Sequence, residues 1–205
     1  SGVEAGATWQ YSTDSGSTWS AAQAAATTTF TLAEGTYATG AVQVRQTDVA
    51  GNISTVGSST SSWTIDTTPA TTTVSTAAFS ADTGSSSSDF ITKTTSQDIS
   101  GTLSTTLASG EIVYVSLDNG STWSTATTTV GQNTWSLTGQ TLTASSTLKV
   151  KVTDAAGNDG TVYSQAYTVD TTLPSAPTLA LTSDTGSSNT DNITSSTGVT
   201  VSGVE

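Results

Sequence analysis

The stretch TLKVKVTD, Thr147 to Asp154, sets apolar residues against lysines and ends in a Thr-Asp pair. Apolar and charged residues that alternate with a period of two predict a β-strand with one face in a core and the other in water. The inward residues of this strand would be Leu148, Val150 and Val152. The earlier stretch AVQVRQTD, Ala41 to Asp48, has the same pattern, with Val42 and Val44 expected to point inward.

Three further motifs recur at nearly the same distance. The copies are TDVAGN from Thr47 and TDAAGN from Thr153, IDTT from Ile65 and VDTT from Val169, and DTGSSSSDFIT from Asp82 and DTGSSNTDNIT from Asp184. They lie 106, 104 and 102 residues apart, which predicts a structural unit of about a hundred residues. SGVE also begins the chain at Ser1 and ends it at Glu205. We therefore expect the back of one unit in residues 1–66, a complete unit in 67–171 and the front of a third in 172–205.

Other alternating stretches supply the remaining strands of the complete unit. They are predicted around Val74–Phe79, Ile99–Leu103, Glu111–Asp118, Trp135–Leu137 and Tyr167–Val169. About seven short strands in a hundred residues is the number found in an immunoglobulin-like sandwich. The predicted fold class is therefore all-β, with tandem immunoglobulin-like β-sandwich domains of about seven strands each. The stretch LAEGTY, Leu32 to Tyr37, also favours this fold, because such sandwiches often place a tyrosine corner before the sixth strand.

The composition excludes several kinds of chemistry. Ser and Thr make up about 40% of the chain and hydrophobic residues only 33%, so the core must be thin. There is no Cys, Met or His, which excludes disulfides, cysteine zinc sites, cysteine nucleophiles and histidine-based triads within this sequence. No apolar run is long enough to cross a bilayer, so membrane insertion is not expected.

The charge of the chain points toward an external cation. Sixteen acidic residues face only four basic ones, for a formal net charge of −12. Nucleic acid and anionic membranes are poor partners for such a surface. Two carboxylates about 4 Å apart repel by about 4 kcal/mol at the effective dielectric of a protein surface. Where Asp residues are brought together, a cation is therefore the natural partner.

The stretches STDSGSTW, Ser12 to Trp19, and SLDNGSTW, Ser116 to Trp123, have the spelling of the Asp-box of sialidases. We expect each to close a hairpin, with the Asp accepting backbone N–H groups and the Gly supplying a positive φ. A glycosidase would need a carboxylate pair or a Tyr nucleophile, and sialidases add several Arg residues. This chain has one Arg, Arg45, so no catalytic residue and no enzyme activity are expected.

The repeated Asp motifs predict calcium sites at the junctions between units. In a sandwich the first loop lies at the pole where the last strand leaves, and the TDxAGN loops lie at the opposite pole. Ca²⁺ accepts six to eight oxygen ligands in irregular geometry, whereas Mg²⁺ is stricter. The predicted ligands are Asp82, Asp89 and Asp170 at one junction, Asp66, Asp154, Asn158, Asp184 and Asp191 at a second, and Asp48 and Asn52 at a third.

The alternative is that these Asp residues only cap turns, as Asp before Gly commonly does. The repetition in register of three motifs, in a chain with few cations, favours calcium. Four other acidic residues are assigned to solvated surface: Asp98, Asp159, Glu34 and Glu111.

The order of the motifs from TIDTTPATT through DTGSSSSDFIT and D-x-G-x-T-W to TDxAGN resembles the bacterial Ig-like repeats of giant secreted adhesins, including RTX-type and biofilm-associated surface proteins. The resemblance implies tandem Ig-like domains, export to the surface of a Gram-negative bacterium and calcium bound at domain junctions. The residues at the matching positions are Asp66, Asp82, Asp89, Asp154, Asp170, Asp184 and Asp191.

Taken together, these features predict a structural extender of a bacterial surface adhesin or filament, rigidified by Ca²⁺. Its partners would be neighbouring Ig-like repeats of the same or an identical chain, while a distal domain outside the segment binds host or matrix glycan or protein. One alternative is a glycan- or protein-binding module that uses exposed aromatics such as Tyr114. Another is a subunit that polymerises as residues 172–205 of one copy complete residues 1–66 of the next. We expect a window of a longer repeat rather than a whole subunit.

Overall fold

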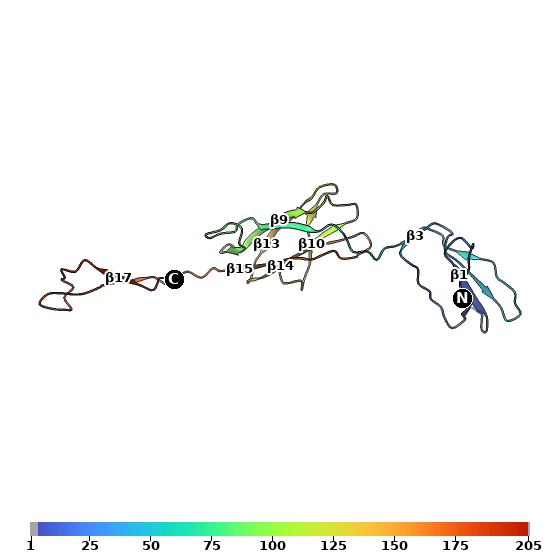
Figure 1. Ribbon diagram of the computed structural model, residues 1–205, viewed down its shortest axis with the longest axis horizontal. Coiled ribbons are helices and arrows are strands. Elements are labelled where there is room, and N and C mark those ends of the chain that lie inside the picture. The colour runs from blue at the N-terminus through green and yellow to red at the C-terminus, as the bar shows by residue number, and fades with distance from the viewer. Residues whose placement is uncertain (1–3, 205) are drawn as a thin grey trace.

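A computed structural model of the chain describes residues 4–204, so Ser1 to Val3 and Glu205 of the terminal SGVE motifs lie outside the described residues. The protein is all-β, as the sequence predicts, and Figure 1 shows three parts that follow one another along its longest axis. Within residues 4–204, no helix is long and apolar enough to cross a membrane.

The central part is a two-layer sandwich. Its strands are β7 (Val74–Phe79), β8 (Ile91–Thr92), β9 (Ser96–Leu103), β10 (Ile112–Ser116), β11 (Ser124–Thr125), β12 (Thr127–Thr128), β13 (Thr134–Thr141), β14 (Ser146–Thr153) and β15 (Tyr163–Val169). One sheet has the order β11-β10-β14-β15-β8 and the other the order β12-β13-β9-β7. All pairs are antiparallel except β15 and β8, which are parallel.

The alternation in TLKVKVTD places β14 in the middle of the first sheet. Leu148, Val150 and Val152 are fully buried, while Lys149 and Lys151 lie on the outer face. Each inward side chain of this size stabilises the fold by about 1.5–3 kcal/mol relative to exposure. They pack in one cluster with residues of both sheets, including Ile99 and Trp135. The predicted inner face of this strand is confirmed.

In the sheet of β12, β13, β9 and β7, the ring of Trp135 packs closely against Gly101. Trp135 on β13 is paired with Gly101 on β9, and its side chain is almost fully buried. A Cβ atom at Gly101 would lie 2.7 Å from Cζ2 of the Trp135 ring and would also collide with the carbonyl oxygen of Thr76. The pairing of β7 with β9 shifts register between Val74 and Thr76 at this place. Glycine therefore makes room for the indole.

The N-terminal part is a smaller assembly. Its strands are β1 (Thr8–Ser12), β2 (Gln23–Ala24), β3 (Gly35–Tyr37), β4 (Gln43–Thr47), β5 (Gly57–Ser58) and β6 (Trp63–Ile65). They form a sheet of order β2-β1-β4-β5 and a separate pair of β3 with β6. The hydroxyl of Tyr37 donates to the carbonyl oxygen of Ala33 at 3.0 Å, which confirms the predicted tyrosine corner contact.

Two details of this part differ from the central sandwich, and the first also differs from the sequence-based prediction. Val44 was expected to be buried like its counterpart Val150, but 39% of its surface is exposed whereas Val150 has 0%. Residues 27–33, which correspond to part of β13, form no strand. The reason is the same in both cases, because residues 4–66 contain no counterpart of the β7 and β9 strands that cover and pair with these positions in the central sandwich.

The C-terminal part is a hairpin of β16 (Thr178–Leu181) and β17 (Val199–Ser202). Its pairing of Leu181 with Val199 repeats the pairing of Phe79 with Ile99 between β7 and β9. Residues 172–204 thus fold as the first two strands of a unit without the others.

The contrast between Val150 and Val44 gives a direct test of where the core lies. We expect Val150→Ala to lower the free energy of unfolding of the central sandwich by about 2 kcal/mol, because it leaves a cavity in a packed layer. In a dilute solution of the chain, Val44→Ala should lower the free energy of unfolding of the N-terminal part by far less. Denaturant unfolding monitored by NMR resonances of each part measures both effects, and equal losses would contradict this placement of the core.

Candidate functional site

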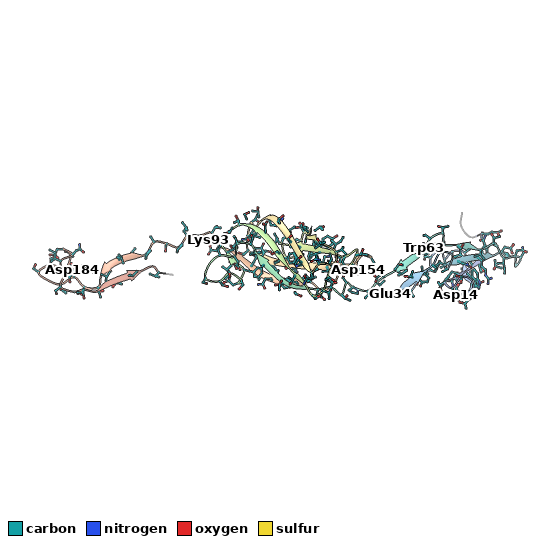
Figure 2. All side chains as sticks on the ribbon, turned by 90° about the horizontal axis from the view of Figure 1, so that it is seen from above. Asp14, Glu34, Trp63, Lys93, Asp154 and Asp184 are labelled. Carbon is teal, nitrogen blue, oxygen red and sulfur yellow. The ribbon has the colours of Figure 1, made fainter. Side chains whose placement is uncertain are left out.

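The two poles of the central sandwich carry the repeated Asp motifs as predicted. In Figure 2, Asp154 lies at the end of the sandwich nearest Glu34 and Trp63, while Lys93 lies at the opposite end. The first loop, residues 80–90, ends beside the last strand, since the N–H of Thr168 donates to the carbonyl of Phe90 and that of Asp170 to the carbonyl of Thr92. The loop and the exit linker therefore share one pole.

At the first junction a direct contact joins the linker to the sandwich. The side-chain Nδ2 of Asn158 donates to the backbone carbonyl of Asp66 at 3.0 Å and to Oδ2 of Asp154 at 3.0 Å. The linker residue Ala70 is buried, and its carbonyl oxygen lies against Gly160, where a Cβ atom would be 2.7 Å away. The structure thus brings together three predicted site residues: Asp66, Asp154 and Asn158.

The TDxAGN loops owe their shape to the Asp-Asn pair. Oδ1 of Asp154 accepts the backbone N–H of Asn158 at 2.8 Å, and the Asp154 N–H donates back to the Asn158 carbonyl at 3.1 Å. Asp48 and Asn52 form the same contacts in the N-terminal part. Hydrogen bonds from the Asn residues lower the pKa of both Asp carboxyls from the ordinary value of 3.8. The turn-capping alternative therefore accounts for part of what these Asp residues do.

Glu34, expected from the sequence to lie on the solvated surface, is a junction residue. Its Oε2 accepts the hydroxyl of Thr67 at 2.8 Å and its Oε1 the hydroxyl of Thr68, both from the linker. These bonds lower the pKa of Glu34, first through Thr68 and then through Thr67. The sequence carried little signal for this role, because a single Glu without a copy in the other unit looks like any surface carboxylate.

At the opposite pole, Asp82 is the least satisfied carboxylate. Its Oδ2 accepts the N–H of Phe90 at 2.9 Å, where Phe90 has a φ of 63°. Its Oδ1 is buried and makes no hydrogen bond within residues 4–204. A buried acceptor without a donor costs about 1–3 kcal/mol, and more if charged. Asp89 and Asp170 each accept one backbone N–H, from Ile91 and Thr172.

The C-terminal hairpin repeats this loop. Oδ2 of Asp184 accepts the N–H of Asn192 at 3.0 Å, and Asn192 has a φ of 59°. Oδ1 of Asp184 is again buried and has no partner among the described residues. Asp191 accepts the N–H of Ile193 at 3.0 Å. The same geometry in two copies indicates that the unpaired oxygen is a property of the loop.

The predicted ligands do not form a cluster of acidic side chains. Among residues 4–204, no group of three or more His, Cys, Asp or Glu side chains lies close enough to hold a metal ion. Asp82, Asp89 and Asp170 share a pole without converging. A cation at either pole would therefore need backbone carbonyl, hydroxyl or water oxygens as well, which Ca²⁺ accepts. The calcium sites stay a prediction.

The Asp-boxes are closed turns. Oδ1 of Asp118 accepts the N–H of Thr122 at 2.8 Å and its Oδ2 the Thr122 hydroxyl at 2.6 Å, while Ser116 donates to Oδ1 at 2.7 Å. The box at Asp14 has the same contacts with Thr18 and Ser12. The hydroxyl of the box Thr is the largest cause that lowers the pKa of each Asp to about 2. The hairpin role predicted for this motif is confirmed.

The tryptophans of the boxes lie beneath two of the four basic residues. The guanidinium of Arg45 is 4.1 Å from the ring centre of Trp19, and the ammonium of Lys151 is 4.7 Å from that of Trp123. Cation–π contacts of this kind contribute about 0.5–1 kcal/mol at exposed sites. Lys151 also forms a salt bridge with Asp159, a residue expected from the sequence to lie on the solvated surface. The positive charges therefore lie on the outer faces of β4 and β14.

Residues 68–171, just over half of the chain, match the family model of the bacterial Ig-like domain. The chain belongs to this family. No curated protein matches the chain. The central sandwich is thus a bacterial Ig-like domain, and the loops described above lie at the two poles of that domain.

The Asp-box pKa values predict how the Ig-like domain responds to acid. A folded-state pKa of about 2, against 3.8 ordinarily, means that the ionised Asp118 contributes stability above about pH 4 and loses it as the pH falls toward 2. We expect Asp118→Asn to lower the melting temperature at pH 7, and the difference from the native chain to shrink between pH 4 and 2. Carboxyl NMR titration checks the premise, and a midpoint near 4 for Asp118 would contradict it.

The contact of Asn158 with the linker predicts that one substitution at this position increases bending between the N-terminal part and the Ig-like domain. Asn158→Ala removes hydrogen bonds at the junction, each worth about 1 kcal/mol, and should broaden the distances between the N-terminal part and the Ig-like domain. The chain has no native Cys, so spin labels at Ser61→Cys and Thr129→Cys would report them.

The matched control is Asn52→Ala, which removes the corresponding side-chain bond from Nδ2 to Oδ2 of Asp48 in a loop that contacts no linker within residues 4–204. If both substitutions broaden the distance distribution equally, Asn158 is not the hinge contact.

Proposed function

We propose that the chain is an extender segment of a large bacterial surface adhesin or filament, in which Ig-like units in series hold a distal binding domain away from the cell. The observation that carries the proposal is the junction contact between Asn158 and the carbonyl of Asp66, which ties the linker to the sandwich. Burial of Ala70 and the Glu34 bonds to the linker add to it. A linker held at several points favours a rod over freely jointed beads.

Calcium is the proposed stiffening ligand. Oδ1 of Asp82 and Oδ1 of Asp184 fit this role, because a buried, unpaired carboxylate oxygen gains most from a cation. Further carboxylate or carbonyl oxygens would come from Asp89 and Asp191 in these two loops, from Asp66 and Asp170 in the linkers, and from Asp154 in the TDxAGN loop. When bound, Ca²⁺ would neutralise repelling charges at each pole and restrict the hinge. The formal charge of −12 gives these poles little internal compensation.

The proposed setting is the outside of a bacterial cell, with neighbouring Ig-like repeats as partners and any host or matrix ligand bound elsewhere in the assembly. Nucleic acid is not a proposed partner, because an anionic surface repels it. The proposed role is not enzymatic. The Asp-box carboxylates accept hydrogen bonds within their own turns, and Arg45 is engaged by Gln10 and Trp19.

The alternative of a glycan-binding module gains little support from Tyr114. Its ring is half-buried, and the ammonium of Lys151 lies 5.9 Å from the ring centre. An aromatic platform for a sugar needs an open ring face. We therefore retain the extender as the single proposed function.

Small-angle scattering with Ca²⁺ and with chelator tests the stiffening. With Ca²⁺ we expect a larger radius of gyration and a narrower distribution of shapes. The reason is that Ca²⁺ would neutralise the carboxylates at each pole and restrict bending at the linkers. Superimposable profiles would end the stiffening proposal.

Calcium titration of variants tests the ligands. Asp82→Asn should weaken binding at the exit pole at least about tenfold, because one anionic ligand is lost. The control is Asp98→Asn, since the Asp98 carboxylate already accepts the N–H of Gly139 at 2.7 Å. If the Asp82 variant and the native chain bind Ca²⁺ with equal affinity, Asp82 is not a calcium ligand.

A further inference from the structure

The linker between the N-terminal part and the Ig-like domain comprises residues 66–73, which join β6 to β7. Figure 2 shows the narrow stretch that it crosses, between Glu34 of the N-terminal part and Asp154 of the domain. Its sequence, DTTPATTT, contains five threonines and one proline. The contacts of these residues determine where the chain can bend between the two parts.

The first residues of the linker are fixed to the N-terminal part. Glu34 directly precedes β3, whose first residue Gly35 pairs with Ile65 at the end of β6, so Glu34 lies where the linker begins. Its Oε2 accepts the hydroxyl of Thr67 at 2.8 Å, and its Oε1 accepts the hydroxyl of Thr68. Hydrogen bonds to an ionised acceptor are about twice as strong as those between neutral groups. The N-terminal part therefore holds the linker as far as Thr68.

The later residues of the linker are fixed to the Ig-like domain. Ala70 is buried against Gly160, where a Cβ atom would lie 2.7 Å from the Ala70 carbonyl oxygen. Thr72 is 5% exposed, and its hydroxyl donates to Oε2 of Glu111 at 3.0 Å. The same Oε2 accepts the N–H of Ala108 at 2.8 Å, which fixes the Glu111 carboxylate. From Ala70 onward the linker therefore belongs to the domain.

Pro69 is the single residue between these two held segments. It is exposed and forms no hydrogen bond with the rest of residues 4–204. The proline ring fixes φ at about −65° and so removes one of the two soft rotations of this residue. Thr68 is restricted as well, because a residue that precedes a proline is disfavoured in the α region. The N–H of Thr68 also donates to Oδ1 of Asp66 at 3.0 Å. Few rotations are thus left between the two parts.

We propose that Pro69 is a one-residue hinge, to which bending between the N-terminal part and the Ig-like domain is confined. A carboxylate on each side, Glu34 before the hinge and Glu111 after it, keeps the neighbouring residues from taking part in the motion. The bond from Asn158 to the carbonyl of Asp66 crosses the hinge and favours one bend angle. The proposal rests on the extender function, since a hinge this short has its use in a rod. Protein contacts alone define it, so it exists with or without bound calcium.

The proline and the carboxylates restrict the chain in different ways, so separate substitutions remove each effect. Pro69→Gly leaves the carboxylates in place and frees φ at the hinge, because glycine adopts more backbone conformations than any other residue. Glu34→Ala keeps the proline and releases Thr67 and Thr68, which extends the mobile segment toward β6. Neither residue lies in the core of the Ig-like domain, so the melting temperature of that domain should not change.

Distances between spin labels at Ser61→Cys and Thr129→Cys measure the bending, with chelator present throughout. We expect the distance distribution of Pro69→Gly to be at least about twice as wide as that of the native sequence, because φ is free at the one residue that is not held. Glu34→Ala should also widen the distribution, since the mobile segment then has more than one residue.

Each substitution has a matched control. Pro174→Gly replaces a proline in the linker that follows β15, outside the labelled segment, and should leave the distance distribution as in the native chain. Glu4→Ala removes the same charge as Glu34→Ala from the same part of the molecule. Because Glu4 lies beside Gln46 and not at the linker, its loss should likewise leave the distribution unchanged.

Nuclear relaxation of backbone ¹⁵N in the native chain tests the hinge without any substitution. The amides of Thr67, Thr68 and Thr72 should have order parameters of about 0.85, the value of rigid backbone. Values below about 0.6 at Thr67 and Thr68 would mean that Glu34 does not hold the linker, which contradicts a hinge of one residue.

Two results from the spin labels would overturn the hinge. One is a Pro69→Gly distribution as narrow as that of the native chain, and the other is a control that widens the distribution as much as the variant it matches. A native distribution as broad as that of a free eight-residue chain, with Ca²⁺ as well as with chelator, would contradict the extender function itself. Failure of the hinge alone therefore differs from failure of the proposed function, because the native distribution is then narrow and the variants leave it so.

Discussion

Burial of the inner face of β14 against the facing sheet is the interaction on which the sandwich depends. Only 33% of the residues are hydrophobic, so few side chains are available to hold two sheets together. Where both sheets are present, Val150 is fully buried. Where one is missing, the same alternation in β4 leaves Val44 exposed and residues 27–33 without strand pairing. A single sheet of this kind leaves its apolar face in water and is therefore not stable by itself.

The abundance of Ser and Thr has a second role besides β-propensity. With four basic residues for sixteen acidic ones, salt bridges cannot satisfy the carboxylates. Hydroxyl and backbone donors do so instead, from Thr18 and Thr122 in the Asp-boxes to Thr67 and Thr68 at Glu34. The buried Oδ1 atoms of Asp82 and Asp184 are exceptions to this pattern, and they occur at equivalent positions.

Local patterns predicted the fold well and the site only in part. The period-two alternation of TLKVKVTD fixed the inner face of β14, and the S-x-D-x-G-x-T-W spelling gave the turn contacts of Asp14 and Asp118. Exposure of Val44 could not be read from its own stretch, because burial depends on strands that lie far away in the sequence. The role of Glu34 depends on where the linker runs, and the separation of Asp82, Asp89 and Asp170 depends on loop conformation, which motif spacing does not specify.

The parallel pairing of β8 with β15 has a mechanical consequence. The chain enters the central sandwich before β7 and leaves it after β15, so tension along a rod of such units would pull on β15 near its end. The bonds from Thr168 to Phe90 and from Asp170 to Thr92 lie side by side across that pull. The two bonds would share a load applied along β15, since both join that strand to β8 just before the linker.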